Sequence, residues 1–208
     1  MRRVILLATI TLLVAQITAS GTAMAESIEN RLGITGKIGV LVPLRDEFIS
    51  GTSEARTGFA VGGGLIYGFG KNYAVEVEAI HMPNLDVEIA GDKVFEASFT
   101  DLSVGLQYRF LPDSRMVPYL GIGADFVKGD LTGITGNEYD MDWTVGGHLE
   151  AGLDYFITRG IAFTVNMKGT YTARGDVKDG DTEVGKYDPT SFMGTLGLRL
   201  FLPESAFY

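Results

Sequence analysis

The sequence predicts an all-β protein: an eight-stranded antiparallel transmembrane β-barrel with short periplasmic turns and long extracellular loops. Three observations support this fold class. Eight segments alternate apolar and polar side chains with a period of two, which is typical of strands that have two unlike faces. The connections between these segments alternate between short and long. Aromatic side chains of the apolar phase gather at both ends of the segments, as they do at the two surfaces of a membrane.

The hairpin Asp101–Phe126 shows the alternation most clearly. Every second residue from Leu102 to Phe110 is apolar, and the pattern resumes from Leu120 after a turn that contains Pro112. Two alternating strands about a tight turn predict an antiparallel hairpin. The same count places the eight predicted strands at Leu32–Leu44, Thr57–Gly70, Tyr73–Ile80 (with apolar residues continuing to Ile89), Leu102–Phe110, Tyr119–Phe126, Asp142–Tyr155, Ile161–Lys168 and Phe192–Leu202.

The connections predict which way the barrel lies in the membrane. Those near 70–72, 111–116 and 157–160 are short, whereas 45–56, 86–98, 128–141 and 172–189 are long and polar. Transmembrane barrels have short turns on the periplasmic side and long loops outside. Both ends of the chain are therefore expected at the periplasmic side.

The aromatic residues predict that the apolar phase faces lipid. One group lies at strand ends beside short turns, and a second group lies beside the long connections. A soluble barrel would bury its apolar phase and would have no reason to place aromatic side chains at both rims. The first group is Tyr67, Phe69, Tyr73, Tyr108, Phe110 and Tyr155, and the second is Phe59, Phe126, Trp143, Tyr171 and Phe192.

The N-terminus has the parts of a secretory signal peptide: Arg2 and Arg3, an apolar run from Val4 to Val14, and an Ala-x-Ala ending at Ala25. We therefore predict a cleaved signal peptide over 1–25 and an outer-membrane barrel over 26–208. The formal net charge is −9, and −11 without Arg2 and Arg3, which argues against a nucleic-acid partner. The chain has no cysteine, which excludes disulfides and thiol chemistry.

The polar phase is predicted to fill the lumen, because eight strands enclose a space just wide enough for side chains. Opposite charges are expected to pair there, since burying either sign alone costs roughly several kcal/mol. Glycines on this phase, such as Gly121 and Gly123, leave room for long side chains opposite. Two interpretations stay open: a closed, salt-bridged core, or a narrow polar path with a gate. The candidate lumen and gate residues are Lys37, Glu76, Glu78, Arg109, His148, Glu150, Lys168 and Arg199.

Pro83 is a candidate for a lateral opening in the barrel wall. It lies well along the third predicted strand, and proline cannot donate a hydrogen bond to a neighbouring strand. It marks either a break in the wall or the end of strand pairing.

No catalytic, metal or cofactor site is predicted. His148 and Glu150 share a strand face but point inward without a serine beside them, and the sequence offers the outward His81 no partner. Hydrolysis of lipid would need a nucleophile and a base aligned towards the lipid. The acidic stretch from Asp176 to Glu183 has no full calcium-loop spacing, and we interpret it as a solvated loop.

Four segments, in this order, resemble the OmpW family of outer-membrane proteins: GKNYAVEVEAIHMP, LQYRF with VPYLGIGADF, GGHLEAGLDYFITRG, and YDPTSFMGTLGLRLF. The resemblance spans nearly the whole mature chain and implies passive uptake of small hydrophobic molecules that leave sideways through the wall, where the family often has a proline. This chain departs from the family pattern at Thr190, in the residues that follow Phe201, and at Glu78 and Lys168. These last two charged residues align with the apolar lumen constriction of the family.

We therefore expect an OmpW-like barrel in the outer membrane of a Gram-negative bacterium, without enzyme activity or cofactor. Its function would be passive passage of small, hydrophobic molecules with lateral exit. The alternative is a closed structural or adhesive barrel whose extracellular loops bind a partner or stabilise the envelope. Expected partners are outer-membrane lipid, lipopolysaccharide and small hydrophobic solutes.

Overall fold

A computed structural model describes residues 27–44, 53–89, 92–133, 138–179 and 182–202, so the predicted signal peptide lies outside the described residues. No helix in this part of the chain is long and apolar enough to span a membrane. The strands are β1 Leu32–Pro43, β2 Ser53–Ala55, β3 Gly58–Gly70, β4 Tyr73–Ile89, β5 Asp92–Arg109, β6 Met116–Gly133, β7 Glu138–Thr158, β8 Ile161–Thr172, β9 Gly175–Asp179, β10 Thr182–Tyr187 and β11 Ser191–Phe201.

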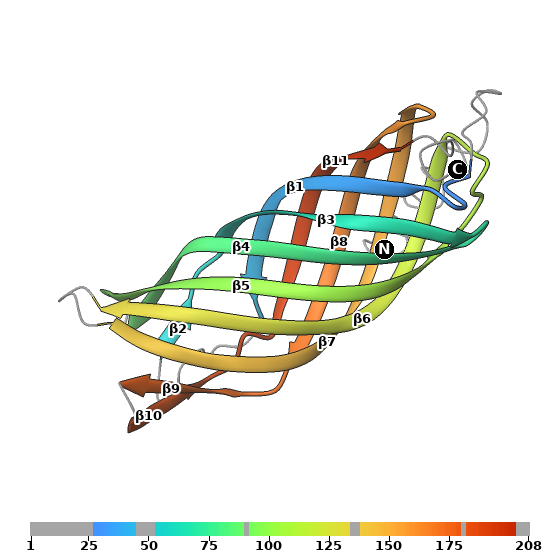
Figure 1. Cartoon of the computed structure of the whole chain (residues 1–208). Helices are drawn as coiled ribbons and strands as arrows, with labels where there is room; N and C mark the ends of the chain where they lie inside the picture. Colours follow the sequence, from blue (N-terminus) through green and yellow to red (C-terminus); the bar gives the residue numbers. More distant parts are fainter. Residues whose placement is uncertain (1–26, 45–52, 90–91, 134–137, 180–181, 203–208) are drawn as a thin grey trace, which may run out of the picture.

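Eight of these strands close into a barrel, which confirms the predicted fold class (Figure 1). Strands β1, β3–β8 and β11 pair antiparallel with their neighbours around the ring. The ring is completed by β1 and β11, paired from Gly33 and Phe201 to Pro43 and Ser191. Because the ring is closed, the sheet has no open edge strand, as a sheet in lipid requires. Below, the end with the short turns is called periplasmic and the other end extracellular.

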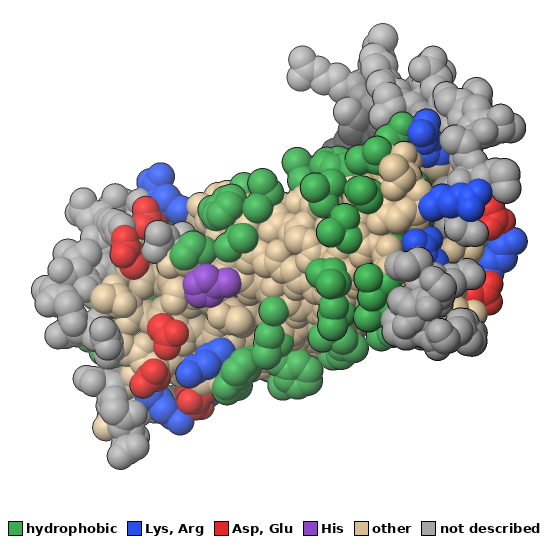
Figure 2. Space-filling model, turned by 45° about the horizontal axis from the view of Figure 1, so that its top comes forward, with side chains coloured by type: hydrophobic (Ala, Val, Ile, Leu, Met, Phe, Trp, Pro, Cys, Tyr) green, Lys and Arg blue, Asp and Glu red, His purple; other side chains and the backbone are tan. Residues whose placement is uncertain are grey.

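The apolar phase lies on the outside, as predicted. Figure 2 shows hydrophobic side chains over the middle of the barrel and charged side chains towards both ends. The periplasmic aromatic group includes a contact chain in which the rings of Tyr73 and Tyr108 are 5.4 Å apart and those of Tyr108 and Phe110 are 4.9 Å apart. At the extracellular end Phe59, Trp143 and Tyr171 are exposed. Two aromatic belts therefore flank an aliphatic band.

The prediction of four long loops was wrong in several places. Strands β4 and β5 stay paired to Ile89 and Asp92, and β6 and β7 to Thr132 and Glu138, so most of 86–98 and 128–141 is strand. Segment 172–189 contains the hairpin of β9 and β10, which pairs with β7. Part of 45–56 is β2, paired with β4, and 45–52 lies outside the described residues. The polar composition was misleading, because strands that rise above the membrane face water.

The inside of the barrel has three layers along its axis. A periplasmic apolar cluster contains Ile66, Phe156 and Phe201. A larger extracellular apolar cluster is built around Phe99 and Leu85. Between them lies a layer of buried charged and polar side chains. This middle layer holds the predicted site residues.

Candidate functional site

All eight candidate lumen residues point inward from β1, β4, β5, β7, β8 and β11, and none is more than 9% exposed. The period of two places them there: once the apolar phase faces lipid, the alternate residues must face the lumen.

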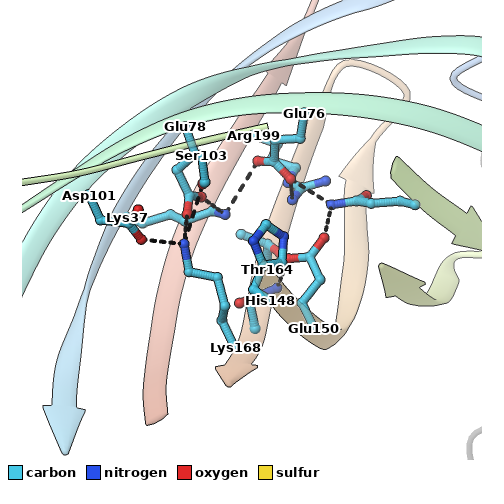
Figure 3. A network of polar contacts seen from close by, with 12 residues as sticks. Lys37, Glu76, Glu78, Asp101, Ser103, His148, Glu150, Thr164, Lys168 and Arg199 are labelled. Atoms are coloured by element: carbon cyan, nitrogen blue, oxygen red, sulfur yellow. Dashed lines mark hydrogen bonds and ion pairs between the residues drawn. The ribbon is translucent and has the colours of Figure 1, made fainter. Parts of the chain in front are cut away.

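These side chains form one continuous chain of ion pairs, part of which is seen in Figure 3. From the extracellular end, Asp101 binds Lys168 at 2.8 Å, and Lys168 lies 3.6 Å from Glu78. Glu78 and Lys168, the two residues that align with the constriction, therefore meet. Glu78 also forms a close ion pair with Lys37. We call the whole set the ion ladder: Asp101, Lys168, Glu78, Lys37, Glu76, Arg199, Asp154 and Arg109.

The periplasmic half of the ion ladder is held by both guanidinium groups. Lys37 lies 3.3 Å from Glu76, whose other oxygen is 2.8 Å from Arg199. Asp154 then bridges Arg199 at 3.2 Å and Arg109 at 2.6 Å. Four carboxylates thus alternate with four cations, which compensates each buried charge with an opposite one.

Two further sets of buried polar side chains lie beside the ion ladder. Asp125 lies 3.4 Å from Lys168 Nζ and 2.8 Å from Nδ1 of His148. Glu150 accepts hydrogen bonds from the side-chain amides of Gln107 at 2.8 Å and Asn166 at 2.7 Å. Sequence reasoning did not single out Gln107 and Asn166 as site residues, although their inward phase was predicted.

Tyr119 was not singled out as a site residue either, although its phase with Gly121 placed it on the inward face. Its ring lies 5.6 Å from the guanidinium carbon of Arg109 and 5.2 Å from that of Arg199. Its hydroxyl accepts a hydrogen bond from Asn166 at 3.1 Å. The available signal was that Tyr119 lies two residues before Gly121 on the same strand and therefore shares its inward face.

The absence of a side chain at Gly121 makes room for Glu150. A Cβ at position 121 would overlap the Glu150 carboxylate, and one at position 123 would overlap the imidazole of His148. The predicted role of the inward glycines is therefore confirmed at these two positions.

The middle layer is closed. A cavity of about 10 Å³ lies among Glu76, Glu78, His148, Glu150 and Lys168. One water needs roughly 10–15 Å³ on the same measure. Since the eight candidate lumen residues are at most 9% exposed, the described side chains leave no continuous aqueous path through this layer.

The periplasmic end is closed by residues that precede the first predicted strand. Ile28 packs into the periplasmic cluster, and Arg31 donates hydrogen bonds to the carbonyls of Arg159 at 2.8 Å and Leu202 at 3.1 Å. The Arg31 guanidinium also lies 5.5 Å from the centre of the Phe201 ring. The alternation begins after these residues, so no sequence pattern indicated this plug.

The extracellular layer contains an apolar cavity of about 30 Å³, lined in part by Leu41, Met82, Leu85, Phe99 and Val127. A register shift between Met82 and Leu85 reverses the phase of β4 and turns Leu85 inward. Leu85 and Val87, which extend the third predicted strand, therefore line the lumen instead of facing out. A local bulge of this kind is not visible in a period-two count.

The β9–β10 hairpin packs over this layer through Tyr187. Its ring lies 6.0 Å from that of Phe99, and its hydroxyl donates a hydrogen bond to the carbonyl of Asp142 at 2.6 Å. Burial, with a smaller contribution from Asp142, raises the pKa of Tyr187 above its usual value. The phenol therefore stays neutral at physiological pH.

Pro83 lies at an irregularity of the wall. Pairing of β3 with β4 ends at Val61 and His81, and it resumes between β2 and β4 at Ala55 and Val87. Between these points, no ladder pair of the described strands joins 57–60 to 82–85, although Phe59 pairs with Val40 on β1 and Met82 with Phe99 on β5. On its other side, Pro83 falls within the register shift between β4 and β5. The residue predicted to mark a break or the end of pairing coincides with both irregularities.

The outward His81 has a partner, contrary to expectation. Its Nδ1 lies 3.1 Å from the hydroxyl of Thr100, its cross-strand neighbour on β5. Among the described residues, no group of three or more His, Cys, Asp or Glu side chains has an arrangement that would hold a metal ion. In the acidic stretch, Asp176 pairs with Lys186 at 3.5 Å.

Comparisons with known proteins agree with this architecture. The family model described as an outer membrane protein beta-barrel domain matches residues 9–199. OprG from Pseudomonas aeruginosa superposes with a TM-score of 0.65 at 14% identity, over 86% of this chain and 99% of OprG. Neisserial surface protein A gives 0.61 at 12% identity, over 83% and 97%. AlkL gives 0.54 at 15% identity, over 88% and 94%. A search of curated protein sequences gives no significant match.

Proposed function

This chain belongs to the family of outer-membrane proteins with a β-barrel domain, and on that premise we propose that it is an OmpW-like passive transporter of small, apolar molecules. The solute enters from the extracellular side and leaves sideways into the membrane. The observation that carries this proposal is the position of the apolar cavity: it is lined by Met82 and Leu85, the two residues that flank the unpaired stretch of wall at Pro83.

The ion ladder supports lateral exit over straight passage. A solute that crossed the middle layer would have to separate buried ion pairs, and leaving one buried charge unpaired costs about 3–5 kcal/mol. The periplasmic plug at Ile28 and Arg31 would then have to open as well. An apolar solute in the extracellular cavity meets neither obstacle if it leaves through the wall.

Few backbone hydrogen bonds join β3 to β4 in the part of the barrel wall beside the cavity. The ladder between β3 and β4 ends at Val61 and His81, and backbone bonding resumes where Arg56 donates its N–H to the carbonyl of Asp86. Pro83 has no backbone N–H to donate, and it falls within the register shift between β4 and β5. Parting the strands at this point costs less than anywhere the ladder is complete.

A disulfide across the unpaired wall tests the proposal. Phe59 and Pro83 lie opposite one another in the register that relates β3 to β4, and the native chain has no cysteine to interfere. In the Phe59→Cys/Pro83→Cys variant, oxidation should reduce uptake of an apolar probe such as toluene to the level of cells without the barrel. A reductant should restore it.

The matched control is Val61→Cys/His81→Cys, because those residues already pair in the ladder. Its oxidation should leave uptake unchanged, and the single variant Pro83→Cys reports the effect of adding a backbone N–H. Wild-type uptake by the oxidised Phe59→Cys/Pro83→Cys barrel would refute lateral exit.

The alternative is a closed barrel whose extracellular part binds a partner or stabilises the envelope. The closed middle layer and the strands that rise above the membrane favour it, in particular the β9–β10 hairpin. Replacing 175–187 with a short turn should then change adhesion or envelope integrity and leave permeability unchanged. If it changes no envelope phenotype while Glu78→Leu alters permeability, this alternative fails. Lipopolysaccharide would be the immediate neighbour under either function.

A further inference from the structure

Three polar side chains form a row across the outer face of β4, β5 and β6, at the extracellular edge of the aliphatic band. This polar row consists of His81, Thr100 and Lys128, which are cross-strand partners in register. Two residues nearer the periplasm along each strand lies an apolar row of Ala79, Leu102 and Phe126. The outer face thus changes from apolar to polar within about 7 Å, a change of the kind that Figure 2 shows towards the ends of the barrel. Such a boundary lies at the depth of the lipid head groups.

Lys128 is a cation without a carboxylate of its own at this boundary. No ion pair among the described residues includes it, and the bulge in β6 sets it opposite Asp142, whose carboxylate is held 2.6 Å from Lys178 Nζ. The next row outward is acidic, because Asp130 faces Asp140 across the strands. These carboxylates repel an anion that approaches from outside, so an anion reaches Lys128 from the membrane side.

His81 orients a second donor beside Lys128. Its Nδ1 lies 3.1 Å from the hydroxyl oxygen of Thr100. When the imidazole carries its hydrogen on Nδ1, it donates to that oxygen and leaves the O–H of Thr100 to donate elsewhere. Side chains directly opposite one another on paired strands stand about 5 Å apart at their Cβ atoms. The hydroxyl of Thr100 and the ammonium of Lys128 can therefore bind two oxygens of one phosphate.

We propose that the polar row is a binding site for a phosphate group of lipopolysaccharide. Lys128 pairs with one phosphate oxygen, Thr100 donates its hydroxyl hydrogen to another, and the acyl chains lie along Leu102 and Phe126, which are 41% and 44% exposed. A phosphorylated lipid is the partner that matches both rows, because it brings a negative charge and an apolar body from the membrane side. The site lies on the outer face and does not depend on the proposed transport.

The test separates the phosphate from the acyl chains. The full barrel in detergent is titrated with lipid A, with lipid A stripped of its phosphates, and with inorganic phosphate, and bound molecules are counted by native mass spectrometry. Lipid A should bind saturably, its dephosphorylated form at least fivefold more weakly, and millimolar inorganic phosphate should not displace it. Lys128→Gln should raise the Kd for lipid A roughly fivefold, the contribution of one cation near an anionic lipid. Thr100→Val should raise it roughly three- to tenfold, because it removes one hydrogen bond to a charged group.

The matched control is Lys186→Gln, which removes an exposed cation at the same end of the barrel. Lys186 lies on β10 and pairs with Asp176 at 3.5 Å, so its loss should leave the Kd unchanged. Equal Kd values for the two forms of lipid A, or equal losses in Lys128→Gln and Lys186→Gln, would overturn the proposal. Displacement of lipid A by inorganic phosphate would show a site for free anions and would overturn the assignment to a lipid. Solute uptake plays no part in these measurements, so either inference can fail without the other.

Discussion

Replacing Lys168 with methionine should destabilise the barrel more than any comparable change at its surface. The Lys168 ammonium lies 2.8 Å from Asp101, 3.4 Å from Asp125 and 3.6 Å from Glu78, and its side chain is 3% exposed. Methionine fills a similar volume but leaves these buried carboxylates without their shared cation. Removing one partner of a buried ion pair costs about 3–5 kcal/mol.

That loss is large enough to measure directly. It lowers the folding equilibrium constant by roughly two to four powers of ten. At a slope of about 2 kcal/mol per molar urea, it shifts the unfolding midpoint by roughly 2 M. Trp143 is the only tryptophan in the chain, so its fluorescence and the gel mobility of the folded barrel follow unfolding in lipid vesicles.

A matched surface variant provides the control. Lys71 lies 2.8 Å from Asp113 in the periplasmic turns, with side chains 58% and 62% exposed, so Lys71→Met should leave the midpoint unchanged. In the double variant Lys168→Met/Asp101→Asn, part of the loss should be recovered, because Asp101 pairs with Lys168 alone in the ion ladder and the substitution removes the charge left unpaired. A loss below about 1 kcal/mol in Lys168→Met would refute the view that the ion ladder depends on its cations.

Three further predictions follow from single contacts. Gly121→Val places a branched side chain where Glu150 lies and should lower the unfolding midpoint, whereas Gly194→Val, whose Cβ meets open space on the outside, should not; equal effects would contradict the packing argument. Arg31→Ala should loosen the plug and speed amide exchange at Asn30, whose N–H bonds to the Gly68 carbonyl at 2.7 Å, without raising ion conductance; a conducting variant would show that the plug alone closes the lumen. Because the pKa of Tyr187 is raised, the folded chain keeps a proton that the unfolded chain releases near pH ~10, so the stability of the β9–β10 region is full below that pH and falls above it. Hydrogen exchange of β9 and β10 should show this alkaline loss in the native chain and not in Tyr187→Phe, and the same loss in both would exclude Tyr187 as its source.

The lumen network shows what sequence periodicity can predict about the charged residues and what it cannot. The period of two assigned Glu78 and Lys168 to the inner face of two strands that lie far apart in the chain. It did not determine which charges meet, because partners across a barrel depend on strand tilt and stagger. The structure brings Lys168 to Asp101, Asp125 and Glu78 together, and gives Glu150 two amide donors instead of a cation.

The apolar cavity shows the opposite case, in which a period-two count fails. Leu85 continues the apolar phase of its strand in sequence but lies inside in space, because the register shift beside Pro83 reverses the faces of β4. A bulge adds residues to one strand alone, so its position depends on the partner strand, which local sequence does not specify.

The sequence by itself determined the eight strands, their orientation towards lipid and the charged nature of the lumen, since each follows from which side chains alternate along one strand. Only the tertiary structure decided that the lumen is closed, that the ladder between β3 and β4 ends at Val61 and His81, and that Leu85 turns inward to line an apolar cavity. Those features arise where strands from distant parts of the chain meet, and their geometry is set by the closure of the whole barrel.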